Sequence, residues 1–286
     1  MGAHITDERG FLTCTAQRLV GADIALDVPS VGATQNIMLA AVLAEGTTTI
    51  TNAAKEPEIV ELATFLNAMG AQVTGAGETT IRISGVKKLH DVKHRVMPDR
   101  IVAGTYMVAA AMTRGDITLT NVSSAYIRPI IARLAEAGCE IIEERDKVRL
   151  IAPSRLRAIR LKTQPHPGFP TDLQPQFTAM LALADGISII EETVFEARNK
   201  HIPELCRMGA DIIQLHGSDT SVIQGVSRLT GTSVNSHDLR GGAALILAGL
   251  AADGKTIVSP SHHVRRGYES IEADLLALGA DITFVE

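Results

Sequence analysis

The feature that most constrains this fold is a repeat of about 70 residues along the chain. One marker is a Gly between apolar and small residues, and it occurs at Gly70, Gly138, Gly209 and Gly279. Its spacings are 68, 71 and 70 residues. A second marker lies at Gly46, Gly115, Gly186 and Gly254, with spacings of 69, 71 and 68. Because two independent markers share one period, we predict four similar structural units.

Each unit reads as an apolar helix, a strand, an amphipathic helix and two more strands. The pattern predicts helices over Ala33–Ala44, Pro57–Met69, Pro203–Met208 and Leu239–Ala252, and strands over Thr47–Asn52, Gln72–Thr74, Thr80–Ile83, Asp116–Asn121, Ile187–Thr193 and Lys255–Ser259. The Gly of the second marker ends the apolar helix, where we expect a left-handed conformation. A helix that is apolar on nearly all sides belongs in the interior. We therefore predict an α/β fold of βαβαββ units, each with one buried and one surface helix.

Composition excludes several classes of protein. The chain has 286 residues, a net charge of −5 and only 3% aromatic residues, so neither a basic surface nor stacking platforms for nucleic acid are expected. No apolar stretch approaches the roughly 20 residues of a membrane span. Cys14, Cys139 and Cys206 have no metal-binding spacing and form no even-numbered disulfide framework. A reducing compartment fits this cysteine usage, and we expect no metal site.

The beginning of the chain falls inside the repeat. Met1-Gly2-Ala3-His4-Ile5 matches the first marker, and Gly2 lies 68 residues before Gly70. The two helices that precede this marker in the other units do not precede Gly2. We therefore expect the chain to open in the middle of a unit and to be a piece of a longer protein.

Four polar residues stand where the buried helices are expected to begin: Ser30, Asp99, Asp172 and Asp238. One interpretation is that each is an N-cap that binds free backbone N–H groups. The other is that equivalent helix ends converge on one ligand, because a helix start carries unpaired N–H groups and a partial positive charge. Repeated units place their equivalent ends close together, which favours the second interpretation.

The residues near these helix starts suit an anionic ligand. Ser30-Val31-Gly32 offers small side chains and backbone donors for a diphosphate. Asp172 follows the Pro-rich segment 165–170, which would hold its carboxylate firmly enough to act as a general base. Three arginines also begin or precede helices: Arg198, Arg240 and Arg266. Their guanidinium groups suit carboxylate and phosphate, although an exposed Arg is often simply solvated.

Several segments together resemble the UDP-N-acetylglucosamine 1-carboxyvinyltransferase family. They are PSVGAT (29–34), LAEGTTTITNAAKEPEIV (43–60), MPDRIVAGT (97–105), PHPGFPTDLQPQF (165–177), ETVFEARNKHIPELCRMGAD (192–211), HDLRGGAALILAGLAADG (237–254) and RRGYESIEADLLALGA (265–280). The resemblance implies the enolpyruvyl-transferase fold, an inverse α/β barrel of six βαβαββ units in two domains. Six units need about 415 residues, so this chain would hold four of them.

The resemblance also implies a division of the chain into domains. Residues 1–97 would be the last repeat of domain one. Residues 98–286 would be domain two, with three repeats but without the strand that the family's N-terminus donates to it. The open edges left by such a truncation favour self-association.

The implied activity is transfer of the enolpyruvyl group of phosphoenolpyruvate to the 3-hydroxyl of UDP-N-acetylglucosamine, the first committed step of peptidoglycan synthesis in the bacterial cytoplasm. Asp172 and Arg266 would be catalytic. Substrate would be bound by Pro29, Ser30, Val31, Gly32, Asp172, Val194, Arg198, Asp238, Arg240 and Arg266. Supporting positions would be Glu56, Asp99, His166 and Thr171. No cofactor, metal, nucleic acid or membrane is implied.

Three other readings of the chain stay open. None of its cysteines matches the family's reactive loop Cys, so the chain alone is expected to have little or no activity. It would then be a non-catalytic remnant that binds the sugar nucleotide, or an incomplete product that folds only with a complementary piece. A related enolpyruvyl transferase with another acceptor is the third reading.

Overall fold

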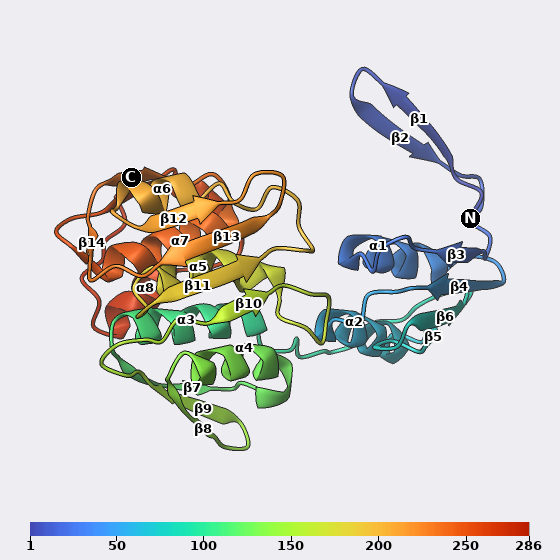
Figure 1. Ribbon diagram of the computed structural model, residues 1–286. Helices are drawn as coiled ribbons and strands as arrows, with labels where there is room; N and C mark the ends of the chain where they lie inside the picture. Colours follow the sequence, from blue (N-terminus) through green and yellow to red (C-terminus); the bar gives the residue numbers. More distant parts are fainter. Residues whose placement is uncertain (286) are drawn as a thin grey trace. The chain divides into compact units, whose positions relative to one another are not determined.

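The computed structural model describes residues 1–285, which form two compact units (Figure 1). Unit 1 comprises Met1–Met97 together with the short segment Pro165–Pro167. Unit 2 comprises Pro98–Gln164 and the residues from Gly168 onward. Both units are built from the predicted repeat.

Unit 1 contains one full βαβαββ repeat. Its elements are β3 (Asp23–Ala25), α1 (Val31–Ala41), β4 (Thr47–Thr51), α2 (Pro57–Ala68), β5 (Gln72–Thr74) and β6 (Thr80–Ser84). The sheet order is β3-β4-β6-β5, with β3 parallel to β4 and the other pairs antiparallel. Alternation places Ile81 and Ile83 of β6 on one face, where they are buried with Ile50 and Met38.

A separate hairpin precedes this repeat. It consists of β1 (His4–Glu8) and β2 (Phe11–Thr15), paired antiparallel with Ile5 opposite Cys14. The hairpin follows the Gly2 marker just as β5 and β6 follow Gly70, so it occupies the last two strand positions of a repeat.

Unit 2 contains three successive repeats. The first has α3 (Arg100–Met112), β7 (Asp116–Thr120), α4 (Ser124–Glu136), β8 (Glu140–Glu143) and β9 (Lys147–Ile151). The second has β10 (Arg160–Lys162), the 3₁₀ helix η1 (Thr171–Leu173), α5 (Gln174–Leu181), β11 (Ile187–Glu191), α6 (Ile202–Arg207), β12 (Asp211–Gln214) and β13 (Thr220–Gln224). The third has β14 (Leu229–Thr230), β15 (Ser233–Asn235), α7 (Leu239–Leu250), β16 (Ala252–Asp253), β17 (Ile257–Ser259), the 3₁₀ helix η2 (Ser261–Arg266) and α8 (Ile271–Ala277).

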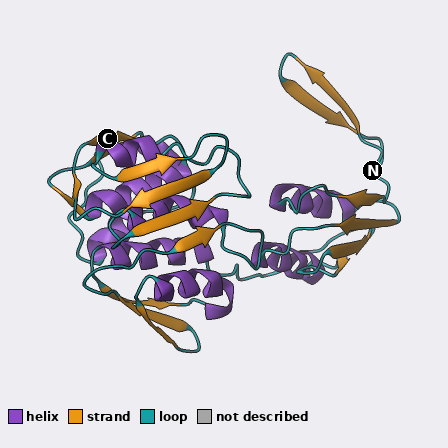
Figure 2. Ribbon diagram, viewed as in Figure 1, coloured by secondary structure: helices purple, strands orange, loops and turns teal. Residues whose placement is uncertain are grey.

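Helices α3, α5 and α7 pack against one another in the interior of unit 2, and the sheet β10-β11-β13-β12 lies over them (Figure 2). All eight residues of α5 are buried. Small residues permit this close packing: a Cβ on Gly104 of α3 would lie 2.4 Å from Leu173 Cδ1. The prediction of an interior apolar helix is confirmed for this unit.

The same prediction is wrong for α1 in unit 1. Only Thr34, Met38 and Ala41 of this helix are buried, and Leu39 is 52% exposed. In unit 2 each apolar helix packs against two others of its kind. Unit 1 contains a single helix of that kind, so nothing within the unit covers its second face.

The helix ends follow the glycine markers with one exception. Gly46, Gly186 and Gly254 have φ values of +89°, +101° and +89°, as expected for a left-handed helix end. After α3 the left-handed residue is Arg114, with φ +59°, rather than Gly115. The prediction that Gly115 takes this conformation is therefore wrong: the left-handed position falls one residue earlier than in the other repeats.

Candidate active site

The starts of the three buried helices of unit 2 carry the predicted acidic residues. Asp99 caps α3, and its Oδ1 accepts from the N–H groups of Ile101 (2.7 Å) and Val102 (3.0 Å). Asp238 caps α7 and accepts from the N–H groups of Arg240 (3.0 Å) and Gly241 (2.8 Å). The N-cap prediction is confirmed at both positions.

Asp172 is not an N-cap, so that interpretation is wrong at this position: Pro170 precedes η1 and Leu173 precedes α5. Asp172 lies in η1, ahead of α5, and its carboxylate binds side chains instead of helix N–H groups. Oδ1 accepts from Nη1 of Arg198 at 2.8 Å, and Oδ2 accepts from Nη2 of Arg240 at 3.3 Å. One carboxylate therefore bridges two guanidinium groups that come from different elements.

The opposite charges of Asp172 and its arginine partners shift the pKa values in this cluster. Burial would raise the pKa of Asp172, but the charges of Arg240 and Arg198 outweigh it and keep the pKa below its usual range. Burial likewise works against the charge of Arg240, yet the Asp172 carboxylate raises the pKa of Arg240. Asp172 is thus ionised at neutral pH, and Arg240 stays charged.

The two arginines are held more firmly than ordinary surface arginines. The side chains of Arg198 and Arg240 are only 11% and 17% exposed. The guanidinium of Arg198 also stacks on the ring of Phe195, with its carbon 4.2 Å from the centroid. Arg240 follows the Asp238 cap, which fixes the first turn of α7. The half-open Asp172 carboxylate is 37% exposed, so the cluster faces solvent on one side.

Arg266, the other residue expected to be catalytic, ends η2 and is exposed. The structure places no ion pair on it within the described part of the chain. Val194 is partly exposed, and its N–H donates to Glu192 Oε1 at 2.9 Å. Thr171, beside Asp172, donates through its hydroxyl to Glu192 Oε2 at 2.9 Å.

Glu192 is a residue that the sequence interpretation missed. It follows β11 directly and is only 6% exposed, yet its carboxylate accepts four hydrogen bonds. Nothing in the local sequence separates it from its neighbours Glu191 and Glu196. Its partners Thr163 and Thr171 lie 29 and 21 residues away, so only the fold reveals the contact.

The remaining predicted residues lie in unit 1. Ser30 caps α1: its Oγ accepts from the N–H of Ala33 at 3.3 Å, so the N-cap prediction is confirmed here as well. Pro29 precedes this cap, and Val31 and Gly32 form the first turn of the helix. Glu56 precedes α2, and its Oε1 accepts from the N–H of His166 at 3.4 Å.

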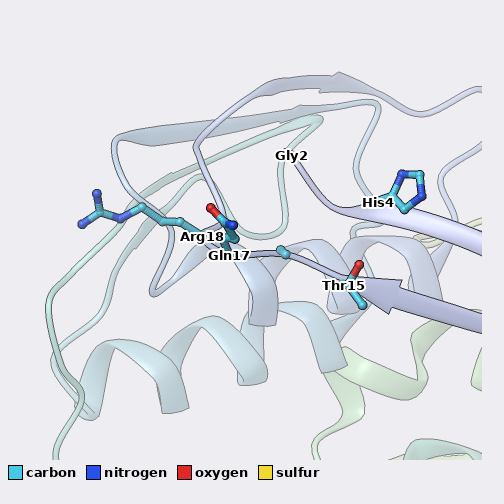
Figure 3. A pocket seen from close by; sticks show the side chains of 6 residues that line it. Gly2, His4, Thr15, Gln17 and Arg18 are labelled. Carbon is cyan, nitrogen blue, oxygen red and sulfur yellow. The ribbon is translucent and has the colours of Figure 1, made fainter.

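A hollow at the base of the β1–β2 hairpin involves none of the predicted residues. Figure 3 shows its lining, which consists of Gly2, His4, Thr15, Ala16, Gln17 and Arg18. Arg18 pairs with Glu45 at 2.8 Å, and both side chains are largely exposed. Such a surface pair contributes little, and the hollow offers no buried polar group that would fix a ligand.

Residues 1–285 offer neither a metal centre of three side chains nor a membrane-spanning helix. No three His, Cys, Asp or Glu side chains are arranged to share a metal ion. None of the helices is both long enough and apolar enough to cross a membrane.

Repeated βαβαββ units, with Asp172 ahead of one buried helix, Arg240 in the first turn of another and Arg198 in the loop after β11, define an α/β repeat protein whose site suits an anionic ligand. The family model for EPSP synthase (3-phosphoshikimate 1-carboxyvinyltransferase) matches residues 1–275. The chain therefore belongs to the EPSP synthase family of enolpyruvyl (1-carboxyvinyl) transferases, and it is an enzyme of that family.

Curated relatives match along nearly the whole chain. UDP-N-acetylglucosamine 1-carboxyvinyltransferase 2 of Caldanaerobacter subterraneus subsp. tengcongensis is 52% identical over 283 residues, which are 99% of this chain and 67% of the relative. UDP-N-acetylglucosamine 1-carboxyvinyltransferase of Finegoldia magna is 54% identical over 290 residues, or 100% of this chain and 68% of the relative. The chain thus spans about two thirds of the length of these relatives.

Solved structures confirm the fold prediction. The enolpyruvyl transferase NikO from Streptomyces tendae has a TM-score of 0.87 and 28% identity, and the match covers 98% of this chain and 69% of that one. EPSP synthase from Acinetobacter baumannii has a TM-score of 0.73 and 25% identity, covering 99% and 68%. The enolpyruvyl-transferase fold expected from the sequence is therefore the fold of this chain.

Proposed function

We propose that the chain takes part in transfer of the enolpyruvyl group of phosphoenolpyruvate to the 3-hydroxyl of UDP-N-acetylglucosamine. The observation that carries this proposal is the Asp172 carboxylate held between Arg198 and Arg240. Relatives at 52% and 54% identity carry the name of this activity. The product would enter peptidoglycan synthesis in the bacterial cytoplasm and so serve cell shape and division.

The reaction gives each of these groups a task. The sugar 3-oxygen bonds to C2 of phosphoenolpyruvate and loses its proton, while C3 gains one, which gives a tetrahedral intermediate. Loss of the C3 proton and cleavage of the C2–phosphate bond then release inorganic phosphate. Asp172 is the acid/base group for the hydroxyl proton, and Arg198, Arg240 and Arg266 neutralise the anionic intermediate.

The ion pairs explain how Asp172 would change on binding. In the free chain the arginines lower the pKa of Asp172 against the effect of burial, so the carboxylate is a weak base. An anionic substrate competes for the same guanidinium groups. Once Arg198 and Arg240 turn to the substrate, less positive charge acts on Asp172, and its basicity rises.

Other residues would bind the sugar nucleotide. The first turn of α1, with Ser30, Val31 and Gly32 after Pro29, offers N–H groups to a diphosphate. A Cβ added to Gly32 meets nothing within 4 Å, so the space above this turn is open. Val194 and Asp238 would contact the sugar nucleotide. Glu56, Asp99, His166 and Thr171 remain the proposed supporting positions.

The repeat also suggests how the units relate to a longer enzyme. We propose that residues 1–97 are the last repeat of a first domain and that residues 98–286 are a second domain of three repeats. The support is that the chain spans 67% of a relative's length and that unit 2 holds three successive repeats.

A phosphate-release assay on the 286-residue chain tests the activity. The expected result is slow phosphate release that requires both phosphoenolpyruvate and UDP-N-acetylglucosamine, because none of the chain's cysteines matches the family's reactive loop Cys. Release with shikimate 3-phosphate as the acceptor instead would favour the related-transferase alternative. Isothermal titration with UDP-N-acetylglucosamine separates the remaining cases: binding without release indicates a non-catalytic binding protein, and absence of both overturns the proposal.

A further inference from the structure

The carboxylate of Glu192 is buried, and both of its oxygens accept hydrogen bonds from the protein. Oε1 accepts from Thr163 Oγ1 at 2.7 Å and from the N–H groups of Val194 (2.9 Å) and Phe195 (3.0 Å). Oε2 accepts from Thr171 Oγ1 at 2.9 Å. A buried carboxylate without partners would be strongly destabilising, so four short bonds indicate a site built around this group.

These donors come from the segments that hold the Asp172 cluster. Thr171 is the residue before Asp172 in η1. Phe195 is the ring on which Arg198 stacks. One carboxylate therefore connects the turn that carries Asp172 with the loop that carries its arginine partner.

The hydrogen bond from Thr163 connects Glu192 to the sheet. Thr163 follows β10, and its Oγ1 also accepts from the N–H of Thr193 at 2.8 Å. The hydroxyl of Thr193 donates back to the Thr163 carbonyl at 2.6 Å. Because this reciprocal pair sits at the ends of β10 and β11, Glu192 has a rigid base from which to position both segments.

We propose that Glu192 is a positioning residue, which sets the distance between Asp172 and Arg198 by holding η1 and the loop 193–195 together. Both of its oxygens are occupied by protein donors, so it acts through its neighbours and does not touch the substrate. Its effect on substrate binding rests on the proposed function, whereas its effect on the Asp172–Arg198 pair does not.

The chemistry of the four donors selects informative substitutions. In Glu192→Asp the carboxylate retracts by about 1.5 Å, so it cannot reach η1 and the loop at once. In Glu192→Gln the amide oxygen can keep the three Oε1 contacts. Its NH₂ then faces Thr171, whose hydroxyl can accept instead of donate. The longer, uncharged residue should therefore preserve the arrangement that the shorter, charged one disrupts.

The first experiment titrates the Asp172 carboxyl carbon by ¹³C NMR in the 286-residue chain, with Asp172→Asn identifying the resonance. In Glu192→Asp we expect the pKa of Asp172 to rise above its value in the parent chain, because its arginine partners are less well placed. In Glu192→Gln we expect the pKa of Asp172 to stay close to its value in the parent chain. The control is Glu191→Asp, one residue earlier, whose carboxylate pairs with the surface residues Arg160 and Lys162. An unchanged Asp172 titration in folded Glu192→Asp overturns the proposal.

A second variant covers the case in which Glu192→Asp does not fold. Thr171→Val removes only the Oε2 contact and keeps the shape of the side chain. It should shift the Asp172 titration in the same direction, and an unchanged titration overturns the proposal.

The second experiment measures UDP-N-acetylglucosamine affinity by isothermal titration. We expect Glu192→Asp to weaken binding by about tenfold or more, as for loss of one well-placed hydrogen bond, while Glu192→Gln and Glu191→Asp stay near the parent value. If the parent chain binds no UDP-N-acetylglucosamine, the proposed function fails, and the NMR titration alone decides the role of Glu192.

Discussion

Asp172 is the residue on which the proposed chemistry depends most directly. Its carboxylate pairs with two arginines whose side chains are largely buried. The Asp172 side chain itself remains partly exposed to solvent. A carboxylate in that setting can exchange its arginine partners for an anionic substrate and then accept a proton.

Replacement of Asp172 by Asn tests this role. The amide cannot accept the hydroxyl proton, so turnover should fall by about 100-fold or more in the phosphate-release assay. The control is Asp185→Asn, which alters an exposed acid paired with Arg155. Near-normal turnover of Asp172→Asn would rule out the acid/base assignment.

His201 supplies a second test at the residue scale. Burial lowers the pKa of His201 from 6.5 to about 4. The charge of Asp238 opposes this shift, and the charge of Arg198 adds to it. The unfolded chain therefore binds a proton on His201 between pH 6.5 and 4 that the folded chain does not. Stability from this group is present above pH 6.5 and is lost as the pH falls through that window.

The expected loss is of the order of 2 to 3 kcal/mol across the window. It is measured by urea unfolding at pH 7, 5.5 and 4.5. His201→Gln removes the titrating group and should flatten the pH dependence, while His216→Gln, at an exposed position, should leave it unchanged. Parallel pH profiles for the parent and His201→Gln would contradict the assignment.

At the scale of single elements, the buried helices depend on glycine where they meet their neighbours. A Cβ on Gly242 of α7 would lie 2.3 Å from Ser236 Oγ and 2.6 Å from Val264 Cγ2. Gly32 of α1 has nothing within 4 Å of the same position. We therefore predict that a Gly-to-Ala substitution destabilises the chain in α7 but not in α1.

Gly242→Ala should destabilise the chain by about 1 to 3 kcal/mol, because the packed core must shift to admit the methyl group. Gly32→Ala should be neutral or stabilising by up to about 1 kcal/mol, because Ala has a higher helix propensity than Gly. Urea unfolding followed by circular dichroism measures both. Equal effects of the two substitutions would show that close packing of α7 is not what requires Gly242.

The sequence correctly predicted features that depend on neighbouring residues, such as N-caps. It did not predict features that depend on residues far apart in the chain. The caps at Ser30, Asp99 and Asp238 follow from a polar side chain beside a helix start, and all three are present. The role of Glu192 depends on Thr163 and Thr171, which only the folded sheet brings near it. Local sequence carries no trace of such a contact.

The exposure of α1 shows the same limit at a larger scale. An apolar helix predicts burial only if the surrounding elements are present to cover it. Unit 2 provides three such helices, and unit 1 provides one. Periodicity therefore predicted the order of the elements, whereas the burial of each helix depends on how many repeats pack together.

At the scale of the whole molecule, the repeat identifies an open strand edge. Each of β6, β9 and β13 has a strand on both sides, whereas β2 pairs with β1 alone among the described strands. The hairpin also exposes Phe11 and Leu12, at 77% and 72%. An open edge beside exposed apolar side chains is a template for pairing with another chain, so we predict concentration-dependent self-association through β2.

Sedimentation velocity over a range of chain concentrations measures this association. Leu12→Lys should reduce it, because a Lys on an edge strand places a charge where a second strand would pair. Leu39→Lys is the matched control, since it adds the same charge to an exposed leucine of α1, away from any strand edge. A parent chain that stays monomeric, or two variants that weaken association equally, would show that β2 is not the contact. If Leu12→Lys alone gives a monomer, the edge that the repeat leaves unpaired is the surface through which copies of this chain meet.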